Sequence, residues 1–275
     1  MMSVMLINGK EIAEDICSRV QKILSKTNTH LSLGVVMVGN DVVMEQFVRI
    51  KKRVAESVGV TLTEHRFSKE ITTQELVRAV QDIITESNSI IVQLPLPQHI
   101  DFKKIQNVIP ASHDVDCLGT QARNAFERGD SPLLPPVVGA IKEILERYSI
   151  EVAEKHVVVV GKGILVGEPV AVWMSQWGAH VVSLDDQDVV AEHTHKADII
   201  VLGAGAPHFL KPDMVKNGVV ILDAGTSESG GKVVGDADPT CADKASLMTP
   251  VPGGIGPIAV AMLFKNLLIC SGTDV

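Results

Sequence analysis

The sequence predicts an α/β protein of two domains, each built on a parallel sheet. Apolar runs typical of buried strands alternate with segments of helical periodicity, stop near residue 110 and start again near residue 156. Val, Ile and Leu must supply the core, because aromatic residues make up only 3% of the chain while hydrophobic residues make up 45%. Strands buried on both faces have this composition. The length of 275 residues suits two modest domains.

In the first half, apolar residues at helical spacing predict a helix that includes Ile12–Leu24. The predicted elements that follow are a strand at 31–38, a helix at 43–58 stopped by Gly59, a strand at 60–67, a helix at 73–86 with Thr73 as its N-cap, and a strand at 89–94. Residues 110–138 lack periodicity and carry Gly129 and the pair Pro135-Pro136, so they predict a loop-rich stretch that leads into a linker.

The alternation then restarts. The predicted elements are a helix at 139–148, a strand at 156–160, a helix at 167–177, strands at 180–184, 199–202, 219–222 and 247–248, and a C-terminal helix at 258–269. Strands that alternate with helices in this way are typical of parallel sheets.

Charge and composition exclude several classes of function. The net charge is −8 and no extended run of Lys and Arg occurs, which argues against nucleic acid or an anionic membrane as a partner. No apolar run is long enough for a membrane span, and the N-terminus does not read as a signal peptide. The four cysteines, Cys17, Cys117, Cys241 and Cys270, lack metal-ligand spacing. We therefore expect free thiols, no metal and a cytoplasmic location.

A glycine-rich turn at the start of the second half predicts a dinucleotide site. The strand HVVVV runs into Gly161-Lys162-Gly163 and, four residues later, Gly167. Glycines between a strand and a helix let the backbone approach a pyrophosphate, and the helix N-terminus stabilises its charge. The spacing G-x-G-x-x-x-G departs from the usual fingerprint, so an ordinary strand-to-helix turn is the alternative.

The end of the next strand bears on the choice of cofactor. HVVSL is followed by Asp185-Asp186, where an acidic residue commonly binds the ribose hydroxyls and repels a 2′-phosphate. The sequence therefore leans towards NAD over NADP, although Lys162 can pair with a 2′-phosphate and the aspartates can instead form a solvated turn. Two later strand ends add Gly205 and Thr226 as candidate cofactor contacts.

Three polar residues of the first half are candidates for chemistry: Lys51, Gln93 and Asp116. Phe47 and Lys51 lie four residues apart and so share a helix face. Gln93 lies at the end of a buried strand, where the strand meets LPLP, and Asp116 lies in an irregular segment. Each also has an ordinary structural interpretation, as a solvated lysine, a backbone-capping glutamine and a turn aspartate. Spacing alone does not decide between them.

Five motifs in a shared order do decide. They are VGNDVVMEQFVRIKKRVAESVGV, IVQLPLP, HDVDCL, GKGILVGEP and TPVPGGIGPIAVAML. The chain thereby resembles the methylenetetrahydrofolate dehydrogenase/methenyltetrahydrofolate cyclohydrolase family over almost its whole length. The resemblance implies a folate-facing domain over 1–120 plus 256–275, a Rossmann NAD(P)-binding domain over 139–255, a C-terminal helix that returns to the first domain, and a homodimer.

The resemblance also implies a reaction and residue roles. A hydride passes from methylenetetrahydrofolate to NAD or NADP, and water then opens the methenyl product to formyltetrahydrofolate. The family's catalytic lysine falls on Lys51, the glutamine that orients it on Gln93, and the pterin-binding aspartate on Asp116. The aromatic that stacks on the folate falls on Phe47. The loop near the folate falls on Pro252, Gly253 and Gly254, and this loop and LPLP are plausible sites of a cis proline.

The chain departs from the family pattern at several of these positions. Phe47 replaces a tyrosine, which keeps the ring but loses the hydroxyl, so we expect reduced activity. Lys162 and Gly163 replace Arg and Ser, and Asp185-Asp186 replace His-Ser, all of which serve the 2′-phosphate of NADP in the family. Met44, His113, Cys117, Pro136, Val137, Val138 and Ala259 also differ from the pattern.

Two other interpretations remain open at this stage. In the first, the chain is a diverged member with one activity or a non-catalytic folate-binding protein, as Phe47 and the altered glycine turn would suggest. Alternatively it is a different Rossmann oxidoreductase, such as a hydroxyacid dehydrogenase, but His195 and His208 lack the Arg or Glu context which that chemistry requires.

Overall fold

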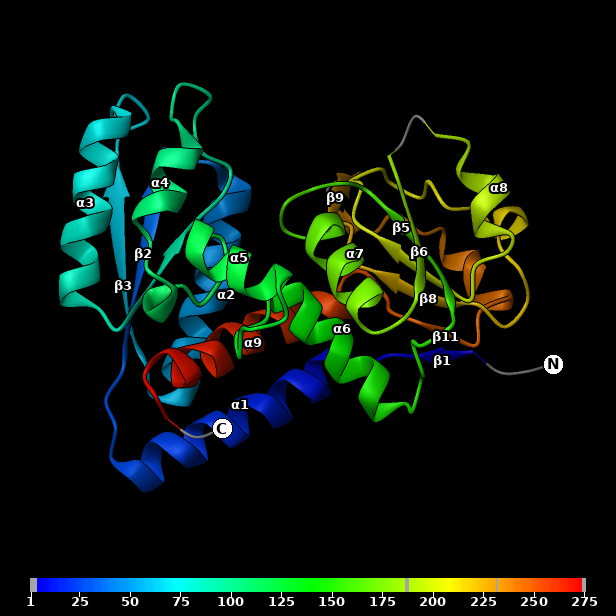
Figure 1. Cartoon of the computed structure of the whole chain (residues 1–275), viewed down its shortest axis with the longest axis horizontal. Coiled ribbons are helices and arrows are strands. Elements are labelled where there is room, and N and C mark those ends of the chain that lie inside the picture. The colour runs from blue at the N-terminus through cyan, green and yellow to red at the C-terminus, as the bar shows by residue number, and fades with distance from the viewer. Residues whose placement is uncertain (1–3, 186–187, 231, 274–275) are drawn as a thin grey trace. The chain divides into compact units, whose positions relative to one another are not determined.

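The computed structural model describes residues 4–185, 188–230 and 232–273. The chain divides into two compact units (Figure 1). We call them by their sheets: the three-stranded unit comprises Glu14–Pro136 and Val260–Val275, and the six-stranded unit comprises Met1–Ala13 and Val137–Ala259. Both are α/β units with parallel sheets, as the alternation of apolar segments predicts.

The sheet of the three-stranded unit has the order β3-β2-β4, with β2 at Ser32–Val38, β3 at Thr61–Phe67 and β4 at Ser89–Val92. Its helices are α2 (Val42–Val58), α3 (Thr73–Glu86), α4 (Phe102–Val108) and α5 (Thr120–Glu127), with a 3-10 turn at Ala111–His113. Most of α1 (Gly9–Thr27) and of α9 (Ile255–Cys270) also belongs to it.

Alternation along β2 divides this unit into layers. Leu33, Val35 and Met37 pack with α1, α2 and α9, whereas Val36 and Val38 pack with α3 and α4 (Figure 1). Successive side chains of a strand point to opposite faces, so a central strand covered on both faces is apolar throughout. This explains why the run at 31–38 is apolar at every position except Ser32 and Gly34.

Local signals set the ends of the helices in this unit. Asp41 caps α2 by accepting the Met44 N–H at 2.8 Å, and Gly59 ends the helix with φ of 81°. The N-cap of α3 is Thr72, one residue before the predicted Thr73. Its hydroxyl accepts the Glu75 N–H, and the Glu75 carboxylate accepts the Thr72 N–H, which forms a capping box.

The sheet of the six-stranded unit has the order β1-β11-β8-β7-β5-β6. The strands are β1 (Met5–Leu6), β5 (His156–Val160), β6 (His180–Leu184), β7 (Ile199–Leu202), β8 (Val220–Asp223) and β11 (Leu247–Met248), and a separate hairpin joins β9 (Ser227–Ser229) to β10 (Lys232–Val234). The helices are α6 (Pro136–Arg147), α7 (Gly167–Gln176) and α8 (Val190–Thr194), with 3-10 turns at Pro212–Met214 and Pro239–Asp243.

The connections of this sheet reverse direction beside β5. The chain leaves β5 to form β6 on one side, then returns to form β7 on the other. Open α/β sheets bind ligands outside the carboxyl ends of their strands at such a switch point. The glycine turn that starts at Gly161 follows β5 directly, so it stands at this position.

The structure differs from the sequence-based expectations in two places. The start of the chain belongs to the six-stranded unit, because β1 pairs with β11 in parallel register. Residues 120–127, predicted to be loop, form the helix α5. A two-residue strand and a helix of two turns carry too little periodicity to be recognised from sequence.

Candidate active site

Lys51 and Gln93 meet in the three-stranded unit. Lys51 lies on α2, and its Nζ donates a hydrogen bond of 2.5 Å to Gln93 Oε1. Gln93 directly follows β4 and is buried. The backbone N–H of Gln93 donates to the Val36 carbonyl, and its side-chain Nε2 donates to the Leu94 carbonyl. The side-chain amide of Gln93 is therefore held at its nitrogen by the Leu94 carbonyl and at its oxygen by Lys51.

Lys51 and Asp116 influence each other's protonation. Burial lowers the pKa of Lys51 below its ordinary value, and the Asp116 carboxylate opposes that shift. Burial raises the pKa of Asp116, and Lys51 opposes it. Removal from water disfavours the charged form of both groups. A lysine with a lowered pKa can take up and release a proton close to neutral pH, which an exposed lysine does poorly.

Phe47 lies one helical turn before Lys51 on α2 and is 38% exposed. Residues four apart lie above one another on a helix. An exposed aromatic ring on the same helix face as Lys51 offers a flat apolar surface against which a planar ring can stack.

The loop that carries Asp116 is closed by a residue that sequence reasoning did not single out. Asp114 is buried, and its carboxylate accepts the N–H groups of Leu118 at 3.2 Å and Gly119 at 2.6 Å. Burial raises the pKa of Asp114 to about 6. Cys117, next to Asp116, has φ of 52°, a region that glycine favours. Cys117 stands where the family pattern has glycine, and it adopts a conformation that glycine favours.

The glycine turn of the six-stranded unit has the form of a phosphate cradle. Gly161 has φ of 102°, and a Cβ on it would lie 2.4 Å from the Gly203 carbonyl oxygen. A Cβ on Gly167 would lie 1.7 Å from the Gly161 oxygen, whereas one on Gly163 would meet nothing within 4 Å. Two of the glycines thus allow tight packing, and Gly163 leaves its side of the turn open, ahead of the N-terminus of α7.

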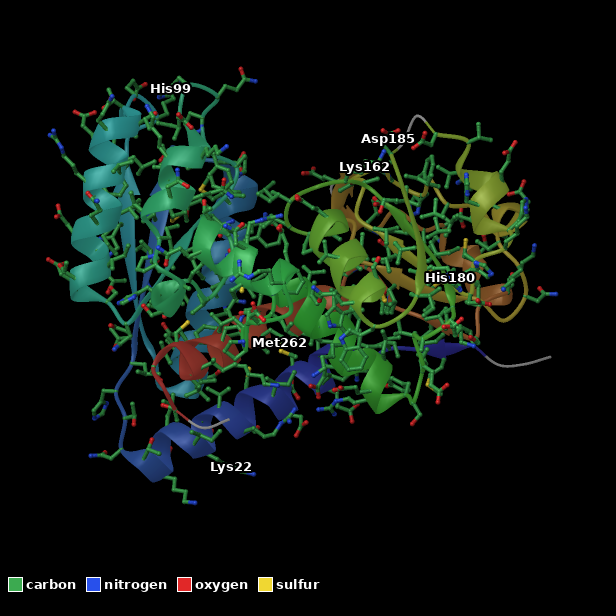
Figure 2. All side chains as sticks on the ribbon, in the orientation of Figure 1. Lys22, His99, Lys162, His180, Asp185 and Met262 are labelled. Atoms are coloured by element: carbon green, nitrogen blue, oxygen red, sulfur yellow. The ribbon has the colours of Figure 1, made fainter. Side chains whose placement is uncertain are left out.

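Lys162 is paired with acidic groups at the end of β6. Its Nζ lies 3.4 Å from Asp185 Oδ2 and 3.8 Å from Asp188 Oδ2, and Figure 2 shows Lys162 and Asp185 side by side. Asp188 also accepts the Asp185 N–H at 2.9 Å. Asp186, predicted together with Asp185 to bind the ribose hydroxyls, lies outside the described residues. Sequence reasoning missed Asp188, whose contribution depends on how the chain turns after β6.

A second buried aspartate shapes the loop that contains Gly205. The Asp236 carboxylate accepts the N–H groups of Ala204, Gly205 and Ala206 at 2.8 to 3.1 Å. Thr226 lies exposed after Gly225, on which a Cβ would fall 2.2 Å from the Asp236 carboxyl carbon. Asp236 therefore holds the loop after β7 by hydrogen bonds and packs closely against Gly225 in the loop after β8.

The loop at Pro252, Gly253 and Gly254 packs against the start of α1. Gly9 N–H donates to the Gly253 carbonyl at 2.9 Å, and a Cβ on Gly9 would lie 1.9 Å from the Gly254 oxygen. The Val251–Pro252 and Leu94–Pro95 bonds are both cis, at the two places proposed from sequence. This loop and the glycine turn belong to the six-stranded unit, while Phe47, Lys51, Gln93 and Asp116 belong to the three-stranded unit.

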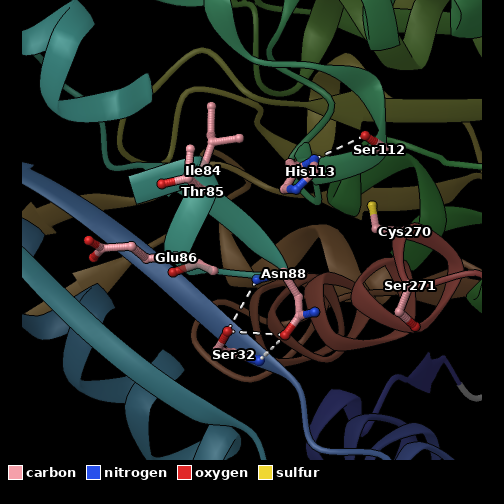
Figure 3. Close-up of a pocket in the computed structure, with 10 residues that line it drawn as sticks. Ser32, Ile84, Thr85, Glu86, Asn88, Ser112, His113, Cys270 and Ser271 are labelled. Carbon is pink, nitrogen blue, oxygen red and sulfur yellow. Dashed lines mark hydrogen bonds between the residues drawn. The ribbon is translucent and has the colours of Figure 1, made fainter. Parts of the chain in front are cut away.

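A polar cavity of about 320 Å³ lies at the end of the three-stranded sheet where β2 and β4 begin (Figure 3). Its lining includes Ser32 and Asn88, which stand at the starts of β2 and β4 and hydrogen-bond to each other, and His113. Gln93 stands at the opposite end of β4. Phe47, Lys51, Gln93 and Asp116 do not line the cavity. The cavity is therefore separate from the site formed by Lys51, Gln93 and Asp116, which we call the lysine site.

Several further properties concern only the part of the chain that is described. No group of three or more His, Cys, Asp and Glu side chains is placed there to hold a metal ion. No helix of 4–185, 188–230 or 232–273 is long and apolar enough to cross a membrane. The four cysteines are free thiols.

Comparison with known proteins identifies the family. Residues 7–116 match the tetrahydrofolate dehydrogenase/cyclohydrolase catalytic domain, and residues 135–274 match the NAD(P)-binding domain of the same family. The chain belongs to this family. The bifunctional protein FolD of Nautilia profundicola is 34% identical over 270 residues, which cover 95% of each chain.

Solved structures of this tetrahydrofolate dehydrogenase/cyclohydrolase family have the same fold. The bifunctional enzyme FolD from Campylobacter jejuni superposes with a TM-score of 0.93 at 30% identity and covers 98% of this chain and 99% of that one. The Trypanosoma brucei dehydrogenase-cyclohydrolase, solved with NADP and an inhibitor, has a TM-score of 0.92 at 29% identity, with 98% of each chain covered.

Proposed function

We propose that this chain oxidises methylenetetrahydrofolate to methenyltetrahydrofolate with a nicotinamide dinucleotide and then hydrolyses the product to formyltetrahydrofolate. The observation that carries the proposal is the partly buried Lys51, which is hydrogen-bonded to Gln93 and interacts electrostatically with Asp116. All three functional groups of the lysine site are present in a chain that matches both domains of the family.

In the hydrolytic step, Lys51 acts as the proton carrier. Its neutral Nζ takes a proton from the water that adds to the cationic methenyl carbon and gives it to the nitrogen released when the ring opens, while the hydroxyl proton of the adduct passes to solvent as the formyl C=O forms. The hydrogen bond to Gln93 Oε1 holds the amine in one orientation. Asp116 accepts hydrogen bonds from the amino and ring N–H groups of the pterin, and a charged acceptor makes such bonds stronger than a neutral one.

Phe47 gives the pterin an apolar surface beside Lys51 without a hydroxyl. Pro252, Gly253 and Gly254 form the loop that contacts the folate in this proposal. A second candidate function is supported by Phe47 itself. A chain that lacks the family's tyrosine hydroxyl fits a diverged member with one activity, or a folate-binding protein without catalysis.

The glycine turn fits a dinucleotide. Gly161 and Gly167 pack too closely for any side chain, and the open side of Gly163 leaves room for a pyrophosphate ahead of α7. Gly205 and Thr226 complete the proposed contacts at neighbouring strand ends. When bound, the nicotinamide ring accepts the hydride. The protein contributes binding and orientation to this step.

We further propose that the cofactor is NAD in preference to NADP. Lys162 is the cation of the turn, and it is already paired with Asp185 and Asp188. A 2′-phosphate at this place would meet two carboxylates and only one ammonium group, whereas ribose hydroxyls can donate to a carboxylate. Asp186 is part of the same proposal from the sequence.

The remaining parts of the proposal concern the cell. We propose that the enzyme works as a homodimer, as the family resemblance implies, which light scattering on the purified protein would test. Free thiols at all four cysteines suit a reducing compartment, and we propose the cytoplasm.

A two-wavelength time course tests the proposed function. Purified protein is mixed with methylenetetrahydrofolate and NAD or NADP, and reduced nicotinamide and the methenyl intermediate are followed together. The proposal expects reduced nicotinamide to form and the intermediate to disappear faster than in buffer. Oxidation with no faster disappearance would support a member with the dehydrogenase activity alone, and no reduced nicotinamide with either cofactor would leave a cyclohydrolase or a folate-binding protein.

A further inference from the structure

Asn266 is a polar side chain buried in an otherwise apolar part of α9. It is 4% exposed, and leucines 263, 267 and 268 around it lie in the core of the three-stranded unit. Its Nδ2 donates two hydrogen bonds of 2.8 Å, one to the Val115 carbonyl and one to the Leu134 carbonyl. Both hydrogens of the amide are therefore used, and each bond reaches a backbone segment more than 130 residues away.

The bond to Val115 acts on Asp116 through the backbone. The Val115 carbonyl and the Asp116 N–H belong to one planar peptide group, so fixing the oxygen fixes the plane from which Asp116 leaves the chain. Asp114 restrains the same loop from the other side through the N–H groups of Leu118 and Gly119. Asp116 thus stands between two restraints, one local and one contributed by the C-terminal helix.

We propose that Asn266 is a positioning residue for Asp116: its amide holds the Val115 peptide so that the Asp116 carboxylate stays beside Lys51. The inference rests on the proposed role of Asp116 in binding the pterin. Asn266 touches neither substrate nor Lys51 and acts through the loop alone.

The chemistry of the amide explains why this position is not apolar. Leucine has a similar size but offers no donor, so it would leave two carbonyl groups without their partners in a buried environment. Aspartate has the same shape but presents oxygens to those carbonyls and would repel them. Only a side chain with two N–H groups on one atom can join both segments to the helix from this place.

The test compares Asn266→Leu with Leu268→Ala. Leu268 is buried on the same helix, two positions on and so about 200° around its axis. It has no bond to the loop, and its truncation weakens the same core. Folate KM, kcat for both steps, NAD binding and deuterium uptake of residues 114–119 are measured on the full-length chain, with rates normalised to the folded fraction.

For Asn266→Leu we expect folate KM to rise about tenfold, NAD binding to stay at the parent value, and residues 114–119 to exchange faster. For Leu268→Ala we expect lower stability with parent folate KM and unchanged exchange in that segment. Parent KM and parent exchange in Asn266→Leu, or equal effects of both variants, would overturn the inference. If the parent protein turns over neither substrate, the proposed function fails, and the exchange data alone still decide whether Asn266 holds the loop.

Discussion

At the scale of single residues, the proposed hydrolysis depends on the protonation state of Lys51. Its side chain is partly buried and hydrogen-bonded to Gln93, and the charge of Asp116 opposes the lowering of its pKa. Burial favours the neutral amine and Asp116 favours the ammonium form, so the lysine is poised to exchange a proton. The rate of hydrolysis should therefore rise with pH as Lys51 loses its proton.

Replacing the amine tests this state. Lys51→Met keeps the length and apolar stem of the side chain, and we expect hydrolysis of methenyltetrahydrofolate to fall about 100- to 10,000-fold, the usual contribution of a proton-transferring group. Lys52→Met, which alters an exposed lysine paired with Glu64, is the matched control. Hydrolysis at the parent rate in Lys51→Met would remove the lysine from the mechanism.

Phe47 permits a gain-of-function test. Phe47→Tyr restores the hydroxyl of the family on an exposed ring one turn from Lys51. One added hydrogen bond near the reacting atoms should raise the rate of hydrolysis about 2- to 10-fold. Steady-state kinetics at saturating folate measure this change. An unchanged or lower rate would show that the missing hydroxyl does not limit this enzyme.

Asp114 should make the stability of the fold depend on pH. Its pKa is raised to about 6 in the folded state, so its contribution is fully present below about pH 3.8 and is lost as pH rises through 6. Between pH 4 and pH 7 the free energy of unfolding of the parent should fall by roughly 3 kcal/mol relative to Asp114→Asn. Urea unfolding measures this difference, with exposed Asp82→Asn as control. Parallel pH curves for the parent and Asp114→Asn would contradict the assignment.

At the scale of elements, we propose that the turn after β5 and the end of β6 together determine which cofactor is accepted. Lys162 is held by Asp185 and Asp188, and the pairing leaves excess negative charge where a 2′-phosphate would lie. The ion pairs are exposed, so they contribute little to stability, but their charge still acts on a ligand.

Removing acidic groups should shift this preference. In Asp185→Ser with Asp186→Ser, Lys162 becomes available to a 2′-phosphate, and kcat/KM for NADP relative to NAD should rise about tenfold or more. The ratio is obtained from initial rates with each cofactor. Asp130→Ser, an exposed change in the three-stranded unit, should leave it as in the parent. If the ratio does not move in the double variant, the aspartates do not face the ribose.

Sequence reasoning succeeded for elements with strong local signals. The buried strands at Ser32–Val38 and His156–Val160, and the stop of α2 at Gly59, follow from apolar runs and from a glycine in the left-handed region. It failed for β1 and α5, which are short, and for the capping residue of α3, where two threonines stand side by side. Short elements owe their existence to partners distant in sequence.

The residues of the candidate site also differ in whether the sequence can predict them. The bond between Lys51 and Gln93 is expected from the family motifs, and the structure shows it at 2.5 Å. Asp114, Asp236 and Asn266 could not be singled out, because each holds backbone N–H or carbonyl groups that only the folded chain brings within reach. Buried polar side chains of this kind become recognisable once their partners are known.

At the scale of the whole molecule, the groups proposed for the two reactions lie in different units. The lysine site belongs to the three-stranded unit and the glycine turn to the six-stranded unit. Hydrolysis needs no nucleotide, so damage to the turn should separate the two activities.

Gly167→Ala should cause this separation. A Cβ there would lie 1.7 Å from the Gly161 oxygen and must push the turn out of shape. Oxidation of methylenetetrahydrofolate should fall by about 100-fold, since displacements near 1 Å have effects of that size. Hydrolysis of added methenyltetrahydrofolate should continue at the parent rate and is the internal control. Equal loss of both activities would mean that the turn supports the whole fold.

In the proposed function one chain performs both steps, and the time course with methylenetetrahydrofolate and each cofactor can show this in a single experiment. Reduced nicotinamide should form faster with NAD than with NADP, and the methenyl intermediate should disappear faster than it does in buffer and faster than it does with Lys51→Met. If neither cofactor is reduced, or if the intermediate decays only at its rate in buffer, the proposed function is contradicted.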